Sequence, residues 1–180
     1  MGFLKNLFKE KEKQKEQPLF QEQPLFQAQP MTVLMPMKGF AMPLEQLSDE
    51  IFSSGTLGRG CGIEPVGDTV YAPFDGTVVQ VAETKHAIGM ESADGIEILI
   101  HVGMDTVEMN GEGFKTLVKQ GDSIKAGTPL LKIDLKAIRE AGHPTETAVV
   151  VTNSDDFADI KLMEAGDIET GMPLLRMSAI

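Results

Sequence analysis

Two segments of this 180-residue chain repeat one pattern of turn residues and apolar residues. Residues 121–131 read GDSIKAGTPLL, and residues 166–175 read GDIETGMPLL, one residue shorter. The tetrapeptide PMKG at 36–39 is likewise echoed by PFDG at 73–76. Glycine and proline at matched positions mark turns, and the apolar residues that follow them are typical of strands. The duplication predicts an all-β antiparallel β-sandwich of two related halves with short helical turns, each half laying down one sheet.

Composition agrees with this expectation and excludes several classes of protein. The 18 glycines and 10 prolines favour many turns, and 42% hydrophobic residues suit a globular core. A net charge of −11 makes nonspecific nucleic-acid binding a poor fit, because phosphates must be neutralised by Lys and Arg. The single cysteine, Cys61, allows no intrachain disulfide. Neither a transmembrane stretch nor a signal peptide is found in the sequence, so we expect a cytoplasmic protein.

The first thirty residues differ in composition from the rest of the chain. In residues 1–16 five lysines outnumber three glutamates, and four apolar residues fall on one helical stripe: Phe3, Leu4, Leu7 and Phe8. Such a basic amphipathic segment either lies on an anionic membrane surface or is a solvated start. Residues 17–30 are rich in Gln and Pro, and EQPLFQ occurs at 16–21 and again at 22–27. This stretch predicts an extended linker, with the folded domain spanning 31–180.

Several local structures are predicted within that domain. Asp94 and Gly95 lie between two apolar runs, 86–91 and 96–102, which is a strong signal for a hairpin. Residues 114–119 and 155–162 are each expected to form a short helical segment.

Strand alternation around the hairpin indicates a candidate site. In the run 96–102 the β-branched residues share one face, so Leu99 and His101 lie on the other, outer face. By the same rule Thr84 and His86 share a face on the neighbouring strand. Folding about the turn brings the two histidines close together, offset by about two residues, which a diagonal cross-strand pair can span.

A pair of histidines backed by a hydroxyl suits phosphoryl transfer. The accepting imidazole must be neutral, with one ring nitrogen held as N–H so that the other keeps a free lone pair. A second donor is needed to stabilise charge on the phosphoryl oxygens. The chain has no P-loop of the GxxxxGK[ST] kind, so nucleotide is not the obvious donor. The alternative is that both histidines are ordinary residues of a sheet.

The motifs around these histidines resemble a known family. They are ETKH at 83–86, ESADG at 91–95, HVGMDTVE at 101–108, GEGF at 111–114 and APFDGT at 72–77. Together they resemble the glucose-class enzyme IIA component of the phosphoenolpyruvate-dependent sugar phosphotransferase system, over essentially all of the expected domain. The resemblance implies an antiparallel β-sandwich with a shallow active-site depression, and a phosphotransferase that forms a phosphohistidine.

The resemblance also implies roles for matching residues. His101 would accept the phosphoryl group on Nε2, and the carbonyl of Gly103 would hold its Nδ1–H. His86 would donate to the phosphoryl group, with its ring oriented by the hydroxyl of Thr84. An apolar docking surface and an acidic border would surround the site, formed by Phe52, Leu57, Leu99, Asp105 and Glu108.

Partners follow from the same resemblance. The phosphoryl donor would be the histidine-containing phosphocarrier protein, and the acceptor would be a cysteine of an enzyme IIB domain in a sugar permease. Because phosphorylation changes the charge of the carrier, the protein could also bind regulated proteins in a way that depends on its phosphorylation state. The basic segment 1–16 resembles the membrane tether of freestanding members, which adds the inner membrane face as a peripheral location. The sugar itself would be bound by the membrane subunit.

Two other classes of protein fit part of the same pattern. A zinc hydrolase could use His86 and His101 with a carboxylate or His143, although the sequence has neither an HxxxH nor an HxH pair. The resemblance requires no cofactor, but it allows zinc shared between the two histidines and a partner protein. A biotinyl or lipoyl carrier would need a lysine at a tight turn, and Lys38, the only candidate, lies at the wrong end of the duplicated pattern.

Overall fold

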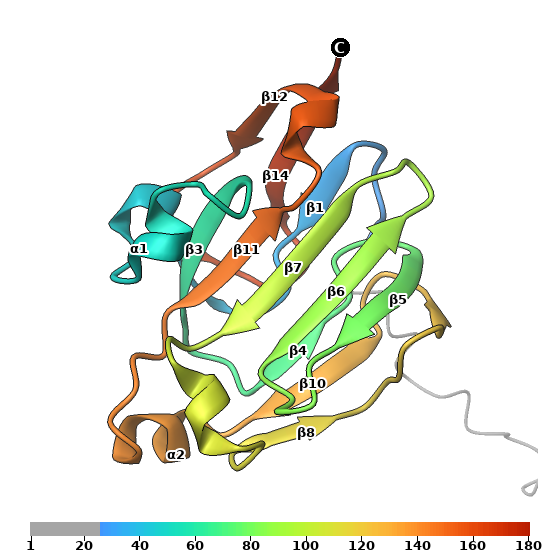
Figure 1. Cartoon of the computed structure of the whole chain (residues 1–180). Coiled ribbons are helices and arrows are strands. Elements are labelled where there is room, and N and C mark those ends of the chain that lie inside the picture. The colour runs from blue at the N-terminus through green and yellow to red at the C-terminus, as the bar shows by residue number, and fades with distance from the viewer. Residues whose placement is uncertain (1–25) are drawn as a thin grey trace, which may run out of the picture.

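The computed structural model describes residues 26–180, so the predicted basic segment and most of the predicted linker lie outside the described residues. The fold consists of one large and two small antiparallel sheets (Figure 1). In spatial order the large sheet contains β13 (Gly166–Ile168), β2 (Gly39–Pro43), β3 (Arg59–Pro65), β11 (Thr147–Val151), β7 (Glu97–Val102), β6 (Ala87–Ser92), β5 (Gly76–Val81) and β9 (Ser123–Ile124). The small sheets contain β1 (Thr32–Leu34), β14 (Pro173–Ala179) and β12 (Phe157–Leu162), and β4 (Thr69–Tyr71), β10 (Pro129–Ile133) and β8 (Phe114–Thr116). The predicted all-β antiparallel architecture is confirmed.

The strand order reveals two equivalent halves. Strands β4 to β10 form one half as a continuous stretch of chain, inserted between β3 and β11 of the other half. In each half the first strand lies in that half's own small sheet, and the next three lie in the large sheet. The last three strands of each half lie in the small sheet, the large sheet and the small sheet in turn. The prediction of two related halves therefore holds. The prediction of one sheet per half is wrong, because both halves contribute four strands to the large sheet.

The duplicated turns form equivalent ion pairs of opposite polarity. Lys38, before β2, lies 3.0 Å from Glu169, after β13, where these two strands pair. Asp75, before β5, lies 3.1 Å from Lys125, after β9, where those strands pair in the same register. The charges are exchanged between the halves while the geometry is kept. Each pair is solvent-exposed and contributes at most about 1 kcal/mol.

Helical structure is confined to short connections. Helix α1 (Glu50–Ser53) follows the 3-10 turn η1 (Leu44–Gln46) between β2 and β3, and α2 (Leu135–Glu140) connects β10 to β11. Two further 3-10 turns are η2 (Thr106–Met109) and η3 (Ser154–Asp156). Within residues 26–180 the helices are all too short or too polar to cross a membrane.

Two predicted helical segments are strands instead. The predicted helix at 114–119 begins with β8, which pairs with β10, and the predicted helix at 155–162 consists of η3 followed by β12, which pairs with β14. A helix of one or two turns has a costly nucleus and little stability of its own. Neighbouring strands offer these segments ladder hydrogen bonds, and that tertiary pairing overrides the local preference.

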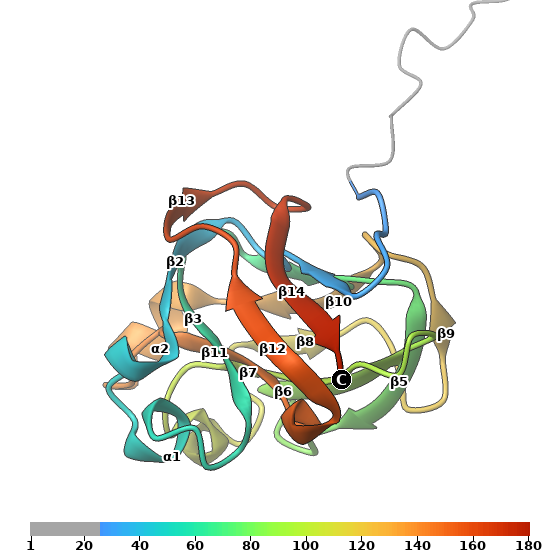
Figure 2. The ribbon, with the colours of Figure 1, turned by 90° about the horizontal axis from the view of Figure 1, so that it is seen from above.

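The main core lies between the large sheet and the two small ones. Figure 2 shows β12 and β14 crossing over the strands of the large sheet. Strand β11 is buried along its whole length between β3 and β7. A second, smaller apolar cluster covers the outer face of β11 near α1, and consists of Leu44, Leu47, Phe52, Met104, Ala148 and Val150. This outer cluster supports the candidate site.

Candidate active site

The site is built on the hairpin of β6 and β7. The hairpin predicted at Asp94 and Gly95 is present, and Gly95 adopts a φ of +78° at its turn. His101 is the second-last residue of β7 and pairs with Ala87 of β6. Alternate residues of β7 enter the main core, which leaves His101 on the outer face beside the second apolar cluster.

His86 reaches the site by a different route from the one predicted. Strand β6 begins only at Ala87, so His86 belongs to a tight turn in which the N–H of Lys85 donates to the carbonyl of Ala82 at 2.8 Å. Lys85 has a left-handed φ of +62°, which ends the strand alternation assumed for Thr84 and His86. The turn, rather than a shared strand face, directs the imidazole toward His101. The two ring centroids lie 4.7 Å apart, edge to face.

One ring nitrogen of His101 is fixed by the backbone. Its Nδ1 lies 2.9 Å from the carbonyl oxygen of Gly103. A carbonyl only accepts hydrogen bonds, so Nδ1 carries the proton and Nε2 of the neutral ring keeps its lone pair. Gly103 has a φ of +74°, and a Cβ there would collide with Cγ2 of Thr106. Thr106 is itself held by donating its hydroxyl to the carbonyl of Val102 at 2.6 Å.

Burial keeps His101 neutral. Burial, with a smaller contribution from the neighbouring His86, lowers the pKa of His101 from 6.5 to about 4. The carbonyl of Gly103 and the charge of Asp49 act in the opposite direction but do not offset burial. The Phe52 ring contributes to this burial, with its centroid 4.7 Å from that of His101. At neutral pH the ring is therefore uncharged and can act as a nucleophile.

His86 is oriented by the hydroxyl of Thr84. Its Nδ1 lies 2.8 Å from Oγ1 of Thr84, and the residue is 8% exposed. Burial lowers the pKa of His86, and a hydrogen bond to the backbone of Thr84 opposes that shift. When the hydroxyl donates to Nδ1, the neutral ring carries its proton on Nε2. The second histidine can then present an N–H donor beside the lone pair of the first.

The predicted docking residues differ in their surroundings. Phe52 is 5% exposed and stacks against His101, and Leu99 is half-buried beside the same cluster. Leu57 is 38% exposed, and both Asp105 and Glu108 are exposed. Phe52 thus supports the imidazole from within. The other four residues are at least partly exposed at the surface.

Two residues near the site have positions that were not predicted from the sequence. Asp49 caps α1 by accepting the N–H of Ile51 at 2.8 Å, and its charge acts on His101. An Asp directly before an apolar helical turn is an N-cap signal, so this role was accessible. His143, named above only as a possible zinc ligand, is largely buried, with Nε2 4.0 Å from Oε2 of Glu108. No local pattern links positions 35 residues apart.

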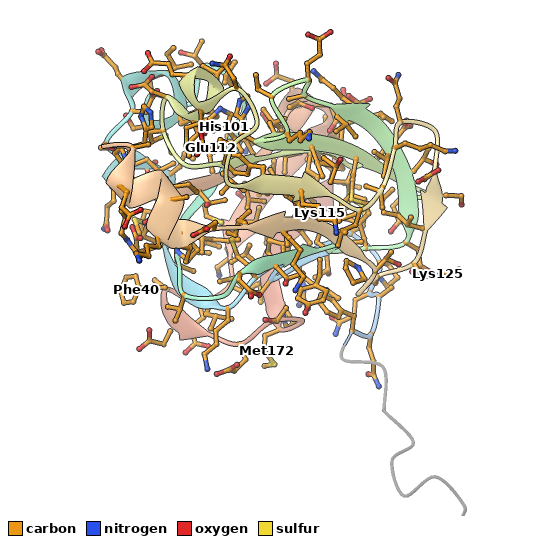
Figure 3. The ribbon with its side chains drawn as sticks, turned by 90° about the horizontal axis from the view of Figure 1, so that it is seen from below. Phe40, His101, Glu112, Lys115, Lys125 and Met172 are labelled. Atoms are coloured by element: carbon orange, nitrogen blue, oxygen red, sulfur yellow. The ribbon has the colours of Figure 1, made fainter. Side chains whose placement is uncertain are left out.

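Other reactive groups do not add to the site. Cys61 is buried in β3, and burial raises the pKa of its thiol to about 12. Throughout residues 26–180 no group of three His, Cys, Asp or Glu side chains gathers as a metal site would require. Lys38, the candidate for a carrier lysine, is paired with Glu169 in the first of the duplicated turns. Figure 3 shows His101 on the side of the molecule away from Phe40 and Met172.

Comparison with known proteins gives one consistent result. The model of the family described as "phosphoenolpyruvate-dependent sugar phosphotransferase system, EIIA 1" matches residues 31–157. The glucose-specific EIIA component of Bacillus cereus is 44% identical over 126 residues, which is 70% of this chain and 76% of that protein. A solved structure, the glucose permease IIA from Mycoplasma capricolum, superposes with a TM-score of 0.75 at 32% identity and covers 80% of this chain and 93% of that one.

Longer relatives match the chain over a small part of their length. The glucoside-specific EIICBA component of Staphylococcus carnosus is 46% identical over 140 residues, which is 78% of this chain but 20% of that protein. The glucose-specific EIIBCA component of Corynebacterium glutamicum is 41% identical over 143 residues, or 79% of this chain and 21% of that protein. The chain thus spans about a fifth of the length of these two relatives.

Proposed function

Because the chain belongs to the phosphoenolpyruvate-dependent sugar phosphotransferase system EIIA 1 family, in its glucose class, we propose that it carries a phosphoryl group on Nε2 of His101. One observation carries the proposal, namely the 2.9 Å contact between Nδ1 of His101 and the carbonyl of Gly103. This contact leaves the lone pair on Nε2 of a ring that burial keeps neutral.

In phosphoryl acceptance, Nε2 of His101 is the only atom of this chain that forms a bond to phosphorus. The lone pair on Nε2 of His101 attacks the phosphorus of a phosphohistidine on the phosphocarrier protein. A new nitrogen–phosphorus bond forms while the donor's bond breaks, and the electron pair of that bond returns to the donor imidazole. His86 stabilises the charge on the phosphoryl oxygens by donating from Nε2 while Thr84 holds its Nδ1. The exposed carboxylates of Asp105 and Glu108 attract basic groups of the donor.

In the onward transfer His101 is the leaving group instead of the nucleophile. A cysteine thiolate of an enzyme IIB domain attacks the phosphorus, the bond to Nε2 of His101 breaks, and that nitrogen regains its lone pair. The Gly103 carbonyl keeps the proton on Nδ1 throughout, so the imidazole leaves as a neutral ring. The His86 donor lowers the barrier in this direction by the same charge stabilisation.

The test is the intact mass of three proteins after incubation with phosphoenolpyruvate, enzyme I and the phosphocarrier protein. Wild type gains one acid-labile phosphoryl group, and His101→Ala gains none. His86→Gln is still phosphorylated, although more slowly, and it retains the phosphoryl group when an enzyme IIB domain is then added. His143→Gln is a matched control, because it changes a third imidazole that lies beside Glu108 rather than beside the phosphoryl acceptor. A wild-type protein without added mass would refute the carrier role.

We also propose that His86 and His101 together can bind a zinc ion. Nε2 of His101 has a free lone pair, and Nε2 of His86 gains one when its ring takes the other tautomer and donates from Nδ1 to Oγ1 of Thr84. A partner protein would supply the remaining ligands, because the described residues provide no third one. Zinc bound there would occupy the nitrogen that accepts the phosphoryl group. Phosphorylation and such partner binding are therefore expected to exclude one another.

A further inference from the structure

One side chain of the EQPLFQ repeat is seated on the folded domain. Phe26 belongs to the second copy and is 5% exposed, although residues 27–30 after it are exposed. Its ring centroid lies 5.7 Å from that of Tyr71, at an interplanar angle of 44°. The ring also contacts Gly127, where an added Cβ would come within 2.7 Å of Cδ2 of Phe26. Tyr71 and Gly127 therefore form a seat for one phenylalanine, here called the Phe26 seat.

The Phe26 seat is held in place by contacts that do not involve the peptide. The N–H of Gly127 donates to the carbonyl of Ala72 at 2.8 Å, and the N–H of Ala72 donates to the carbonyl of Thr128 at 2.8 Å. Asp75 accepts the N–H of Ala126 at 2.9 Å and pairs with Lys125 in the same loop. A preformed seat loses little entropy when a phenylalanine enters it.

The chain contains a second segment that matches the seated one. Residues 16–24 read EQPLFQEQP, and residues 22–30 read EQPLFQAQP, so that eight of nine positions are identical. The one difference places Glu22 where Ala28 lies, and Ala28 is exposed. Phe20 of the first segment corresponds to Phe26 of the second. Every side chain that the seated segment buries is thus present six residues earlier.

We propose that the Phe26 seat is a docking site for Gln-Pro-Leu-Phe segments of this chain, and that residues 16–24 are its second occupant, exchanging with residues 22–30. When Phe20 is seated, residues 25–30 form an additional loop before Met31, and the entropy of closing that loop makes Phe26 the predominant occupant. The exchange moves the anchor point six residues toward the basic segment 1–16. It shortens the reach of that segment by at most about 20 Å.

The location of the seat separates it from the phosphoryl carrier site. In Figure 3, the blue start of the described chain and His101 lie at opposite corners of the molecule. Either occupant can therefore be seated while His101 meets a partner. The inference does not depend on the proposed function, and its failure would leave that function untouched.

The chain provides its own reporter for the experiment. It has one tyrosine and no tryptophan, so intrinsic fluorescence reports on Tyr71 alone. We expect acrylamide quenching of the full-length Phe20→Ala variant to equal that of wild type, because Phe26 stays seated. The Phe20→Ala/Phe26→Ala double variant should be quenched at least twofold more strongly. Phe26→Ala alone should show less than half of that increase, because Phe20 takes the seat.

Two results with the variants would overturn the proposal. One is a Phe26→Ala variant that is quenched as strongly as the double variant, and the other is a double variant that matches wild type. A titration of the double variant with the free peptides EQPLFQ and EQPLAQ separates an emptied seat from a loosened loop. Millimolar EQPLFQ should return the quenching toward the wild-type value while EQPLAQ leaves it unchanged. Equal behaviour of the two peptides would also overturn the proposal.

Discussion

Nδ1 of His101 lies 2.9 Å from the carbonyl oxygen of Gly103, two residues further along the same chain. A single backbone bend thus decides which nitrogen of the imidazole carries the proton. The bend depends on a positive φ at Gly103, and the ring that it holds lies 4.7 Å, between centroids, from both His86 and Phe52.

The low pKa of His101 makes stability depend on pH. The unfolded chain takes up a proton near pH 6.5 that the folded chain does not accept until about pH 4. The free energy of unfolding therefore does not depend on His101 well above pH 6.5, and it decreases as the pH falls from 6.5 toward 4. Between pH 7 and pH 5 we expect wild type to lose about 2 kcal/mol more than His101→Gln. Urea unfolding at the two pH values measures this difference, and equal losses would show that His101 titrates normally.

Replacement of Gly103 should disturb both the fold and the acceptor. A Gly103→Ala variant meets a positive φ and a collision with Thr106, and should lose roughly 2–4 kcal/mol of unfolding free energy together with most phosphoryl acceptance. Gly95→Ala is the matched control, because its φ of +78° is similar but no atom lies within 4 Å of the added Cβ. It should lose only about 1–2 kcal/mol and remain fully phosphorylated. Unfolding curves and intact mass are the measurements, and equal phosphorylation of both variants would contradict the role of the Gly103 carbonyl.

Phe52 should affect the chemistry of His101 through burial. Phe52→Ala removes a buried ring against the imidazole and should cost about 3–5 kcal/mol of unfolding free energy. Water then reaches the imidazole, so the pKa of His101 should rise from about 4 toward its usual value. NMR titration of the imidazole measures that shift. Leu57→Ala, at an exposed position, is the control: it should leave the pKa of His101 unchanged and slow only phosphoryl acceptance from the phosphocarrier protein. An unchanged pKa of His101 in Phe52→Ala would argue against the role of the Phe52 ring.

Cys61 should report global unfolding. Its thiol is buried and its pKa is raised to about 12, so at pH 8 it has almost no thiolate and no access to reagent. We expect labelling by a thiol reagent to proceed at the rate of unfolding and to accelerate with urea in parallel with it. Labelling within seconds in the absence of urea would show that β3 opens locally.

Much of the architecture could be predicted because it is written in local patterns. The duplicated Gly and Pro positions indicated two related β halves, and alternation along 96–102 placed His101 on the outer face. The Asp94-Gly95 turn predicted its hairpin, because turn chemistry acts over a few residues. The motif resemblance supplied the roles assigned to Thr84 and Gly103, whose contacts with the two imidazoles the structure displays.

What the sequence determined by itself was therefore the pattern: which residues alternate, where the chain turns, and which motifs it contains. Tertiary structure alone decided that β8 and β12 are strands, because partner strands outweigh weak local preferences. It also decided the turn that aims His86, the burial that keeps His101 neutral, and the approach of His143 to Glu108. Each of these depends on distance through space between residues that are separated along the chain, which no local pattern encodes.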